Sequence, residues 1–181
     1  DAAQLARARG LHAWTSFLVA DADSLPFHDE QFDAALTYGV VHHLPDPARA
    51  CAEIHRVLQV GGCFFACENN RSALRPLFDW LMEKFPLWNE KAGAEPLISE
   101  RMVREWHAGL PVSIRLWWTV YLPPHVFNAL GFRVAYWLMK GTNALCGIVP
   151  GFRKAAGLIF WEIRKSARNE SDEKPAPQAG P

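Results

Sequence analysis

The sequence has no excess of charge of either sign. Its 181 residues include 19 basic and 19 acidic side chains, so the formal net charge at pH 7 is zero. Domains that bind nucleic acid usually carry a basic patch or a basic overall charge. The balance of charge therefore argues against a nucleic acid as the partner of this protein.

Cysteine is scarce as well, and the four cysteines show no paired spacing of the kind that binds a structural metal. Cys63 and Cys67 lie four residues apart on a predicted strand, so they face the same side of it, which favours buried free thiols. Free thiols are typical of reducing compartments. We therefore expect a cytoplasmic protein without a metal site.

Long apolar runs are missing too. The most apolar stretch, residues 126–149, is interrupted by Asn128, Arg133, Lys140 and Asn143, whereas a membrane-spanning helix needs about 20 apolar residues. This stretch is predicted to form a helical cap over a ligand pocket. Its aromatic side chains also suit a lid for a greasy substrate, or a helix that rests on a membrane surface and makes the protein peripheral to the membrane.

Half of the residues are hydrophobic, which is enough for one domain core. Near the N-terminus two apolar runs each end in small or polar residues, and an amphipathic segment follows them. This alternation predicts parallel strands over residues 12–20 and 32–36 in an α/β sheet, both of them buried. Because ligands bind beyond the carboxyl ends of such strands, residues 21–23 and 37–39 are the predicted site.

The order of the motifs between Asp21 and Gly62 is more specific. An Asp-Ala-x-x-Leu-Pro-Phe stretch is followed by Phe-Asp at the start of a strand, by His-His-Leu-x-Asp-Pro, by a helix ending in Glu-Ile-x-Arg-Val-Leu, and by a glycine pair before a third strand. These motifs together resemble the second half of a class I S-adenosylmethionine-dependent methyltransferase of the small-molecule, type 11 kind. One position departs from the family, which usually has proline where this chain has Val60. The matching residues are Asp21, Ala22, Leu25, Pro26, Phe27, Phe32, Asp33, His42, His43, Leu44, Asp46, Pro47, Glu53, Ile54, Arg56, Val57, Leu58, Gly61 and Gly62.

The resemblance implies a Rossmann-like methyltransferase sheet with a helical cap. Members of the family begin with a strand, a Gly-x-Gly turn and a second strand that ends in an acid. No Gly-x-Gly turn precedes Asp21 in this chain, and residues 1–9 match the helix that follows the second strand. We therefore expect the sheet to be incomplete, with the first two strands and one helix missing, and the chain alone to be inactive.

The resemblance also implies S-adenosylmethionine as the cofactor. Asp21 would accept a hydrogen bond from the adenine amino group, because an ionised carboxylate only accepts, and the backbone at Ala22 would donate to a ring nitrogen. Thr37, Tyr38 and Gly39 would face the sulfonium and the methyl group, since a glycine allows a close approach and an aromatic ring can flank a cation. The alternative is that Asp21 caps a turn and that Tyr38 lies at the rim of its strand.

His42 and His43 are the candidate catalytic residues. In the family this pair lies on the loop over the methyl end of the cofactor. Histidine titrates near neutral pH, so either ring could take a proton from the acceptor during methylation. The alternatives are packing of the loop and, since two adjacent histidines invite it, a metal site, for which no third ligand stands at a convincing spacing.

Four parts are predicted along the chain: the cofactor-binding core over 1–70, a helical cap and substrate-side region with one strand over 71–156, the last core strand over 157–165, and a disordered tail over 166–181. Within them, apolar periodicity and the N-cap residues Asp46 and Ser99 define the individual elements. The expected helices cover 1–10, 46–58, 74–85 and 96–108, and the further strands cover 63–67, 112–121 and 157–165.

The predicted function is methyl transfer from S-adenosylmethionine to a small or lipid-like acceptor. Alignment of the acceptor behind an already activated methyl group can supply ~7–11 kcal/mol of the barrier. Two alternatives stay open, a non-catalytic methyltransferase-like fragment and a nicotinamide-dependent oxidoreductase. The His-His-Leu-x-Asp-Pro motif argues against the oxidoreductase, and nothing in the sequence predicts the oligomeric state.

Overall fold

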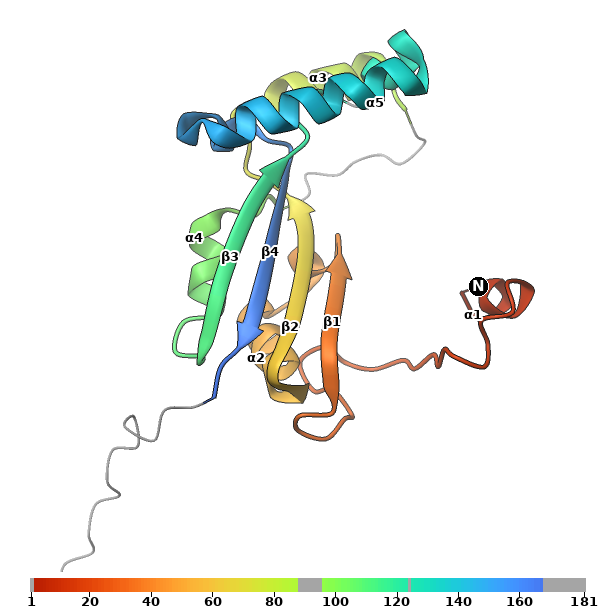
Figure 1. Cartoon of the computed structure of the whole chain (residues 1–181), viewed down its shortest axis with the longest axis vertical. Helices are drawn as coiled ribbons and strands as arrows, with labels where there is room; N and C mark the ends of the chain where they lie inside the picture. Colours follow the sequence, from red (N-terminus) through yellow and green to blue (C-terminus); the bar gives the residue numbers. More distant parts are fainter. Residues whose placement is uncertain (1, 88–95, 124, 168–181) are drawn as a thin grey trace, which may run out of the picture.

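A four-stranded mixed sheet organises the protein, whose computed structural model describes residues 2–87, 96–123 and 125–167. The strand order is β1-β2-β4-β3. The first two strands are parallel, whereas β4 runs antiparallel to both of its neighbours. The predicted α/β class is confirmed, and the one parallel pair among the described strands is β1 with β2, which frame the His-His motif (Figure 1). The strands are β1 (Phe32–Tyr38), β2 (Leu58–Asn69), β3 (Val112–Thr119) and β4 (Leu158–Lys165).

One face of the sheet carries the hydrophobic core. Helices α2 (Pro47–Val57) and α4 (Glu100–Trp106) lie behind this face (Figure 1). The side chains of a strand alternate between its two faces, so every second residue of the central strands points towards the helices, among them the fully buried Phe64 and Trp161. The core cluster consists of Val41, Cys51, Leu58, Phe64, Ala66, Ile98, Val103, Ile159, Trp161 and Ile163.

Both predicted helix caps are present. The Asp46 carboxylate accepts a hydrogen bond from the backbone N–H of Arg49 at 3.0 Å, and Pro47 occupies the first turn of α2. The Ser99 hydroxyl accepts from the backbone N–H of Met102 at 3.4 Å. These side chains satisfy N–H groups that have no partner within the helix, which is why the helices begin where the sequence predicted.

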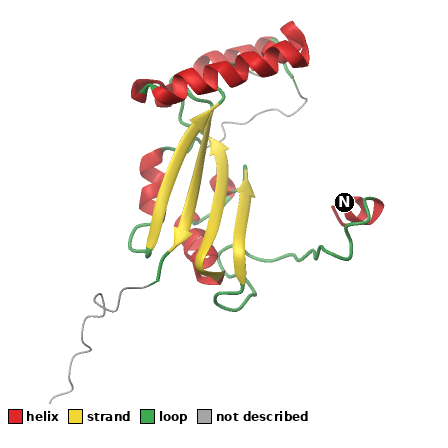
Figure 2. Ribbon diagram, viewed as in Figure 1, coloured by secondary structure: helices red, strands yellow, loops and turns green. Residues whose placement is uncertain are grey.

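A second layer of helices lies across the end of the sheet where β1 and β2 finish (Figure 2). It contains α3 (Arg75–Lys84), α5 (His125–Ile148) and the short 3-10 helix η2 (Pro150–Ala155). Gly131 (φ +71°) interrupts α5, so two helical pieces meet there at an angle. The Asn143 side chain joins this layer to β3 by accepting from the backbone N–H of Val120 at 2.9 Å.

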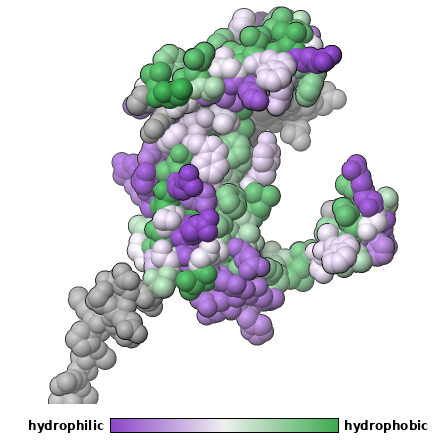
Figure 3. Space-filling model, viewed as in Figure 1, coloured by the Kyte–Doolittle hydropathy of each residue, from purple (hydrophilic) through white to green (hydrophobic). Residues whose placement is uncertain are grey.

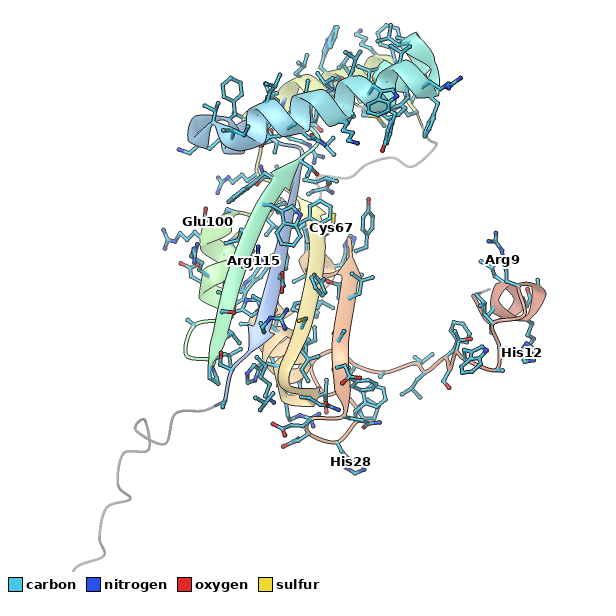
Figure 4. All side chains as sticks on the ribbon, viewed as in Figure 1. Arg9, His12, His28, Cys67, Glu100 and Arg115 are labelled. Atoms are coloured by element: carbon cyan, nitrogen blue, oxygen red, sulfur yellow. The ribbon has the colours of Figure 1, made fainter. Side chains whose placement is uncertain are left out.

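The predicted strand over residues 12–20 is wrong. This segment contains no strand, its side chains are exposed, and together with α1 (Ala2–Ala8) it stands apart from the sheet. Figure 4 shows Arg9 and His12 on this arm, away from the sheet. An extended segment becomes a strand only when a neighbouring strand accepts its backbone hydrogen bonds. Within the described part of the chain no strand lies beside residues 12–20.

The expectation that β1 is buried is also wrong. β1 is an edge strand. Its residues Leu36 and Tyr38 lie on the face of the sheet that α2 and α4 do not cover. Leu36 is consequently 77 % and Tyr38 71 % exposed. An apolar run in the sequence shows that a strand suits a buried site, but burial itself depends on which other elements cover that strand.

The glycine pair lies within β2 and not in a turn before it, because β2 already begins at Leu58. Gly61 adopts a positive φ of +83°. A Cβ atom at Gly62 would stand 2.8 Å from the carbonyl oxygen of Gln59 and 3.0 Å from that of Asp33, so no larger residue fits there. The pair therefore permits an irregular start of β2 against β1.

Further predictions concern the cysteines, the membrane and the tail. Cys67 is buried and Cys63 is half-buried, and both are free thiols. Burial, followed by the nearby Glu68 charge, raises the pKa of the Cys67 thiol to about 11. None of the described helices is both long and apolar enough to cross a bilayer. The predicted disordered tail lies outside the described residues from position 168 onwards.

Candidate functional site

A buried histidine–glutamate pair lies where β1 and β2 end. Glu68 stands near the carboxyl end of β2, and its Oε1 atom accepts hydrogen bonds from the backbone N–H groups of Val40 (2.9 Å) and Val41 (2.7 Å). Its Oε2 atom contacts Nδ1 of His42. Only 8 % of His42 and 1 % of Glu68 is exposed. One carboxylate therefore fixes both the backbone after β1 and the ring of His42.

The contact with Glu68 leaves one ring nitrogen of His42 available for a further hydrogen bond. The Nδ1 atom of His42 faces the Glu68 carboxylate, and Nε2 is therefore the ring nitrogen that points away from it. Nε2 is buried and has no hydrogen-bond partner within the described residues. A buried ring nitrogen without a partner suits a hydrogen bond to a polar ligand atom.

The second histidine has a different environment. His43 follows His42 in the 3-10 helix η1 (Val41–His43), but its side chain is exposed. The two rings lie against each other, with centroids 3.8 Å apart. The predicted pair is therefore one buried, oriented ring and one ring open to solvent. No group of three or more histidine, cysteine or acidic side chains within the described ranges could hold a metal ion.

The end of β1 provides the residues predicted to face the methyl group. Gly39 adopts φ +61°, donates its N–H to the carbonyl of Cys67 at 2.9 Å, and has open space around its Cα. The Thr37 hydroxyl is buried and lacks a hydrogen-bond partner among the described residues. Tyr38 points out of the exposed face of the sheet. Free polar atoms and open space at one strand end fit the methionine end of the predicted cofactor.

Asp21 lies in an exposed turn, as the alternative interpretation of the sequence expected. Its Oδ1 atom accepts from the backbone N–H of Asp23 at 3.0 Å, and its carbonyl accepts from Ser24 at 3.2 Å. No hydrogen bond or ion pair described in the structure joins Asp21 or Ala22 to residues 37–43. The structure thus assembles the histidines with the end of β1, and it leaves the predicted adenine contacts as a prediction.

The loop that follows Asp21 is fastened to α2 by a pair of side chains. Arg56 donates to the carbonyls of Leu25 (3.0 Å) and Phe27 (2.8 Å), and Glu53 accepts from the backbone N–H of Leu25 at 3.0 Å. Arg56 also pairs with Glu53 and with Asp29. The hydrogen bond from Arg56 is the main reason that the pKa of Glu53 is lowered. The hydrogen bonds to Glu53 and then to Asp29 raise the pKa of Arg56.

Sequence reasoning found only part of these contacts. Glu53 and Arg56 lie three residues apart on a helix, a spacing that suits their ion pair at 2.8 Å but gives no sign of their bonds to the loop. Glu68 was recognisable only as an acid at the end of a strand. Its partner His42 is 26 positions away, and a contact over that separation leaves no local pattern in the sequence.

Comparison with known proteins agrees with this geometry. Residues 1–66 match the methyltransferase domain family. The chain is 30% identical over 117 residues to 2-methyl-6-phytyl-1,4-hydroquinone methyltransferase 2 from the chloroplast of Oryza sativa subsp. japonica, a match that covers 59% of this chain and 34% of that protein. A ubiquinone/menaquinone biosynthesis C-methyltransferase of Bordetella avium is 35% identical over 89 residues, which are 48% of this chain and 35% of that protein. The chain spans about a third of the length of these relatives.

Solved structures share the fold at low identity. The [4+2]-cyclase SpnF superposes with a TM-score of 0.59 at 22% identity, covering 91% of this chain and 62% of that one. A SAM-dependent methyltransferase of Thermotoga maritima, described as a possible histamine N-methyltransferase, gives a TM-score of 0.57 at 20% identity, covering 91% and 69%. These similarities confirm the predicted Rossmann-like sheet.

Proposed function

We propose that this chain, whose residues 1–66 match the methyltransferase domain family, is a class I S-adenosylmethionine-dependent methyltransferase that carries part of a site for methyl transfer to a lipid-like acceptor. The observation that carries the proposal is the His42–Glu68 pair beside the open end of β1. The family match argues against the nicotinamide-dependent oxidoreductase.

The residues divide into those that would hold the cofactor and those that would handle a proton. Asp21 and the backbone at Ala22 would bind adenine, and Thr37, Tyr38 and Gly39 would border the methionine end. When bound, S-adenosylmethionine supplies an activated methyl group. The task left to the protein is to align the acceptor, which is worth several kcal/mol of the barrier.

The two histidines suit different parts of the proton transfer. His43 is exposed, so its ring can reach an acceptor hydroxyl or acidic carbon and take the proton as the methyl group arrives. His42 cannot turn freely, because Glu68 holds its Nδ1 atom. Its Nε2 atom therefore has a fixed direction and, in the neutral ring with the proton on Nδ1, would orient a substrate hydroxyl by accepting from it.

The class of acceptor follows from the relatives and from the surface. The relatives reported above are named for methylation of a phytyl hydroquinone and for ubiquinone and menaquinone biosynthesis. In this chain the exposed Leu36 and Tyr38 flank the end of β1. An apolar border of this kind favours an acceptor with an isoprenoid or other lipid-like chain over a small polar one.

The proposal is tested by cofactor binding in the protein that carries the complete domain. Asp21→Ala should weaken the binding of S-adenosylhomocysteine by about tenfold, because it removes a charge-assisted hydrogen bond of roughly 1.5–3 kcal/mol. His43→Ala should leave the affinity nearly unchanged and reduce the methylation rate instead. Isothermal titration calorimetry measures both affinities.

Two outcomes would contradict the proposal. The opposite order of affinities would refute the adenine role of Asp21. A wild-type protein whose melting temperature does not rise with S-adenosylhomocysteine would favour the remaining alternative, a non-catalytic relative, because any ligand of the folded state stabilises it.

A further inference from the structure

Helix α5 turns an apolar stripe towards solvent. Its packed side carries the fully buried Ala135 and the Asn143 side chain that bonds to β3. After Gly131 most apolar residues of the helix are exposed, and five of them share one side: Val134 (54 %), Trp137 (64 %), Leu138 (44 %), Leu145 (71 %) and Ile148 (79 %). Steps of three, four and seven residues place these side chains on one side of a helix. We call this set the α5 stripe.

The α5 stripe reverses the usual pattern of a surface helix, which turns its polar side to water. Figure 3 shows hydrophobic and intermediate residues over much of the visible surface of the upper helical layer, where α5 lies. An open hollow on this surface is lined by Arg133, Val134, Trp137 and Leu138. A continuous exposed apolar surface of this kind marks a site of interaction.

The lysines and arginines of α5 and η2 have no acidic counterpart within these two helices. Residues 125–155 include four basic residues and no aspartate or glutamate, although the whole chain is neutral. Arg133 and Lys140 lie seven positions apart, so both stand on the same edge of the stripe. The Lys140 ammonium lies 4.9 Å from the centre of the Trp137 ring. The basic residues are Arg133, Lys140, Arg153 and Lys154.

We propose that the α5 stripe docks the protein on an anionic lipid surface. The apolar side chains would enter the headgroup region, Trp137 would lie at the interface, and Arg133 and Lys140 would contact lipid phosphates. The helix would lie in the plane of the membrane, since no described helix is suited to span it. A second copy of the chain fits less well, because two surfaces with the same positive charge repel each other.

This inference does not depend on the proposed methyl transfer and is tested separately, with the full chain and vesicles. The protein should sediment with vesicles of phosphatidylcholine and phosphatidylserine, and much less with phosphatidylcholine alone. Added salt should release it, because salt screens the attraction between exposed charges. R133Q/K140Q should weaken binding to the anionic vesicles on the order of thirtyfold. W137E/L145E should abolish it.

Matched variants separate the α5 stripe from general surface effects. L18E changes a similarly exposed apolar residue in the segment before Asp21, and R101Q/R104Q removes two exposed charges from α4. Both should bind vesicles like the wild type, and circular dichroism should show that all variants are folded. Equal sedimentation of the stripe and control variants would overturn the proposal. So would no sedimentation of the wild type, or a dimer in analytical ultracentrifugation that W137E/L145E converts to a monomer.

Discussion

Glu68 shows how a single buried side chain can organise the end of a sheet. Its carboxylate satisfies the backbone of Val40 and Val41 and holds the ring of His42. Without it, two N–H groups that point into the protein would lose their acceptor, and an unsatisfied buried polar group costs about 1–3 kcal/mol. The backbone that follows β1 is therefore rigid because of a residue on the neighbouring strand.

The substitution Glu68→Gln should destabilise the folded protein. Glutamine keeps one acceptor oxygen but replaces the other with a neutral NH2 group, so the ring of His42 loses its carboxylate partner. The free energy of unfolding should fall by ~1–3 kcal/mol. Urea denaturation followed by circular dichroism measures this change.

The matched control is Glu105→Gln on α4. Glu105 pairs with Arg101 at 2.7 Å, and both side chains are largely exposed. Exposed ion pairs contribute about 0–1 kcal/mol. An equal loss of unfolding free energy in the two variants would show that the hydrogen bonds of Glu68 stabilise the fold no more than an exposed ion pair does.

Among the elements, helix α2 contributes both to the hydrophobic core and to the loop before β1. Its apolar side packs in the core through residues such as Cys51 and Val57, and burial raises the pKa of the Cys51 thiol to about 12. Its polar side holds the loop of residues 25–29 through Glu53 and Arg56. The loop has no strand of its own, so these bonds supply the order that a sheet would otherwise provide.

Arg56→Ala should therefore loosen the loop while leaving the sheet intact. The backbone amides of residues 25 and 27–29 should exchange with deuterium about tenfold faster, since the loss of the hydrogen bonds from Arg56 to the loop carbonyls makes local opening easier. Hydrogen exchange followed by mass spectrometry measures the effect. Arg101→Ala is the control, because Arg101 forms an exposed ion pair with Glu105 within α4. Faster exchange over all peptides of the R56A variant would indicate global destabilisation and contradict the local role.

Over the whole molecule, one buried and one half-buried histidine make stability depend on pH. His107 is 3 % exposed, its Nδ1 atom bonds to the carbonyl of Val103 at 2.8 Å, and burial lowers the pKa of its ring below 6.5. The pKa of His55 is lowered as well, first by burial and then by the charge of Lys165. In both cases the folded protein favours the neutral ring.

The stability of the fold should rise with pH in the range where these rings titrate. Between the lowered pKa of the folded state and the ordinary value of about 6.5, the unfolded chain binds more protons, so stability rises with pH. The stabilising effect is complete above 6.5 and is lost as the pH falls. The free energy of unfolding should drop by up to ~1.4 kcal/mol per pH unit for each ring.

Urea titrations at a series of pH values test this prediction. His107→Gln should make the slope below pH ~6.5 shallower, because it removes one of the two rings that gain a proton on unfolding. His28→Gln replaces an exposed ring in the loop before β1 and should keep the wild-type slope. An unchanged slope in H107Q would show that His107 does not couple protonation to folding.

Features encoded within a few neighbouring residues could be predicted without coordinates. The Asp46 and Ser99 caps, the strands at 112–119 and 158–165 and the family motifs each depend on contacts inside one segment or on a fixed spacing. Local hydrogen bonds and side-chain periodicity act at short range, so the residues themselves carry the information.

Everything that needs two distant segments was settled only when the chain folded. Residues 12–20 have the composition of a strand but find no partner, and the apolar β1 lies at an edge with Leu36 in solvent. His42 acquires its orientation from Glu68 on the next strand. Strand pairing, burial and buried hydrogen bonds are properties of the neighbours that folding brings together, and a linear pattern does not name those neighbours.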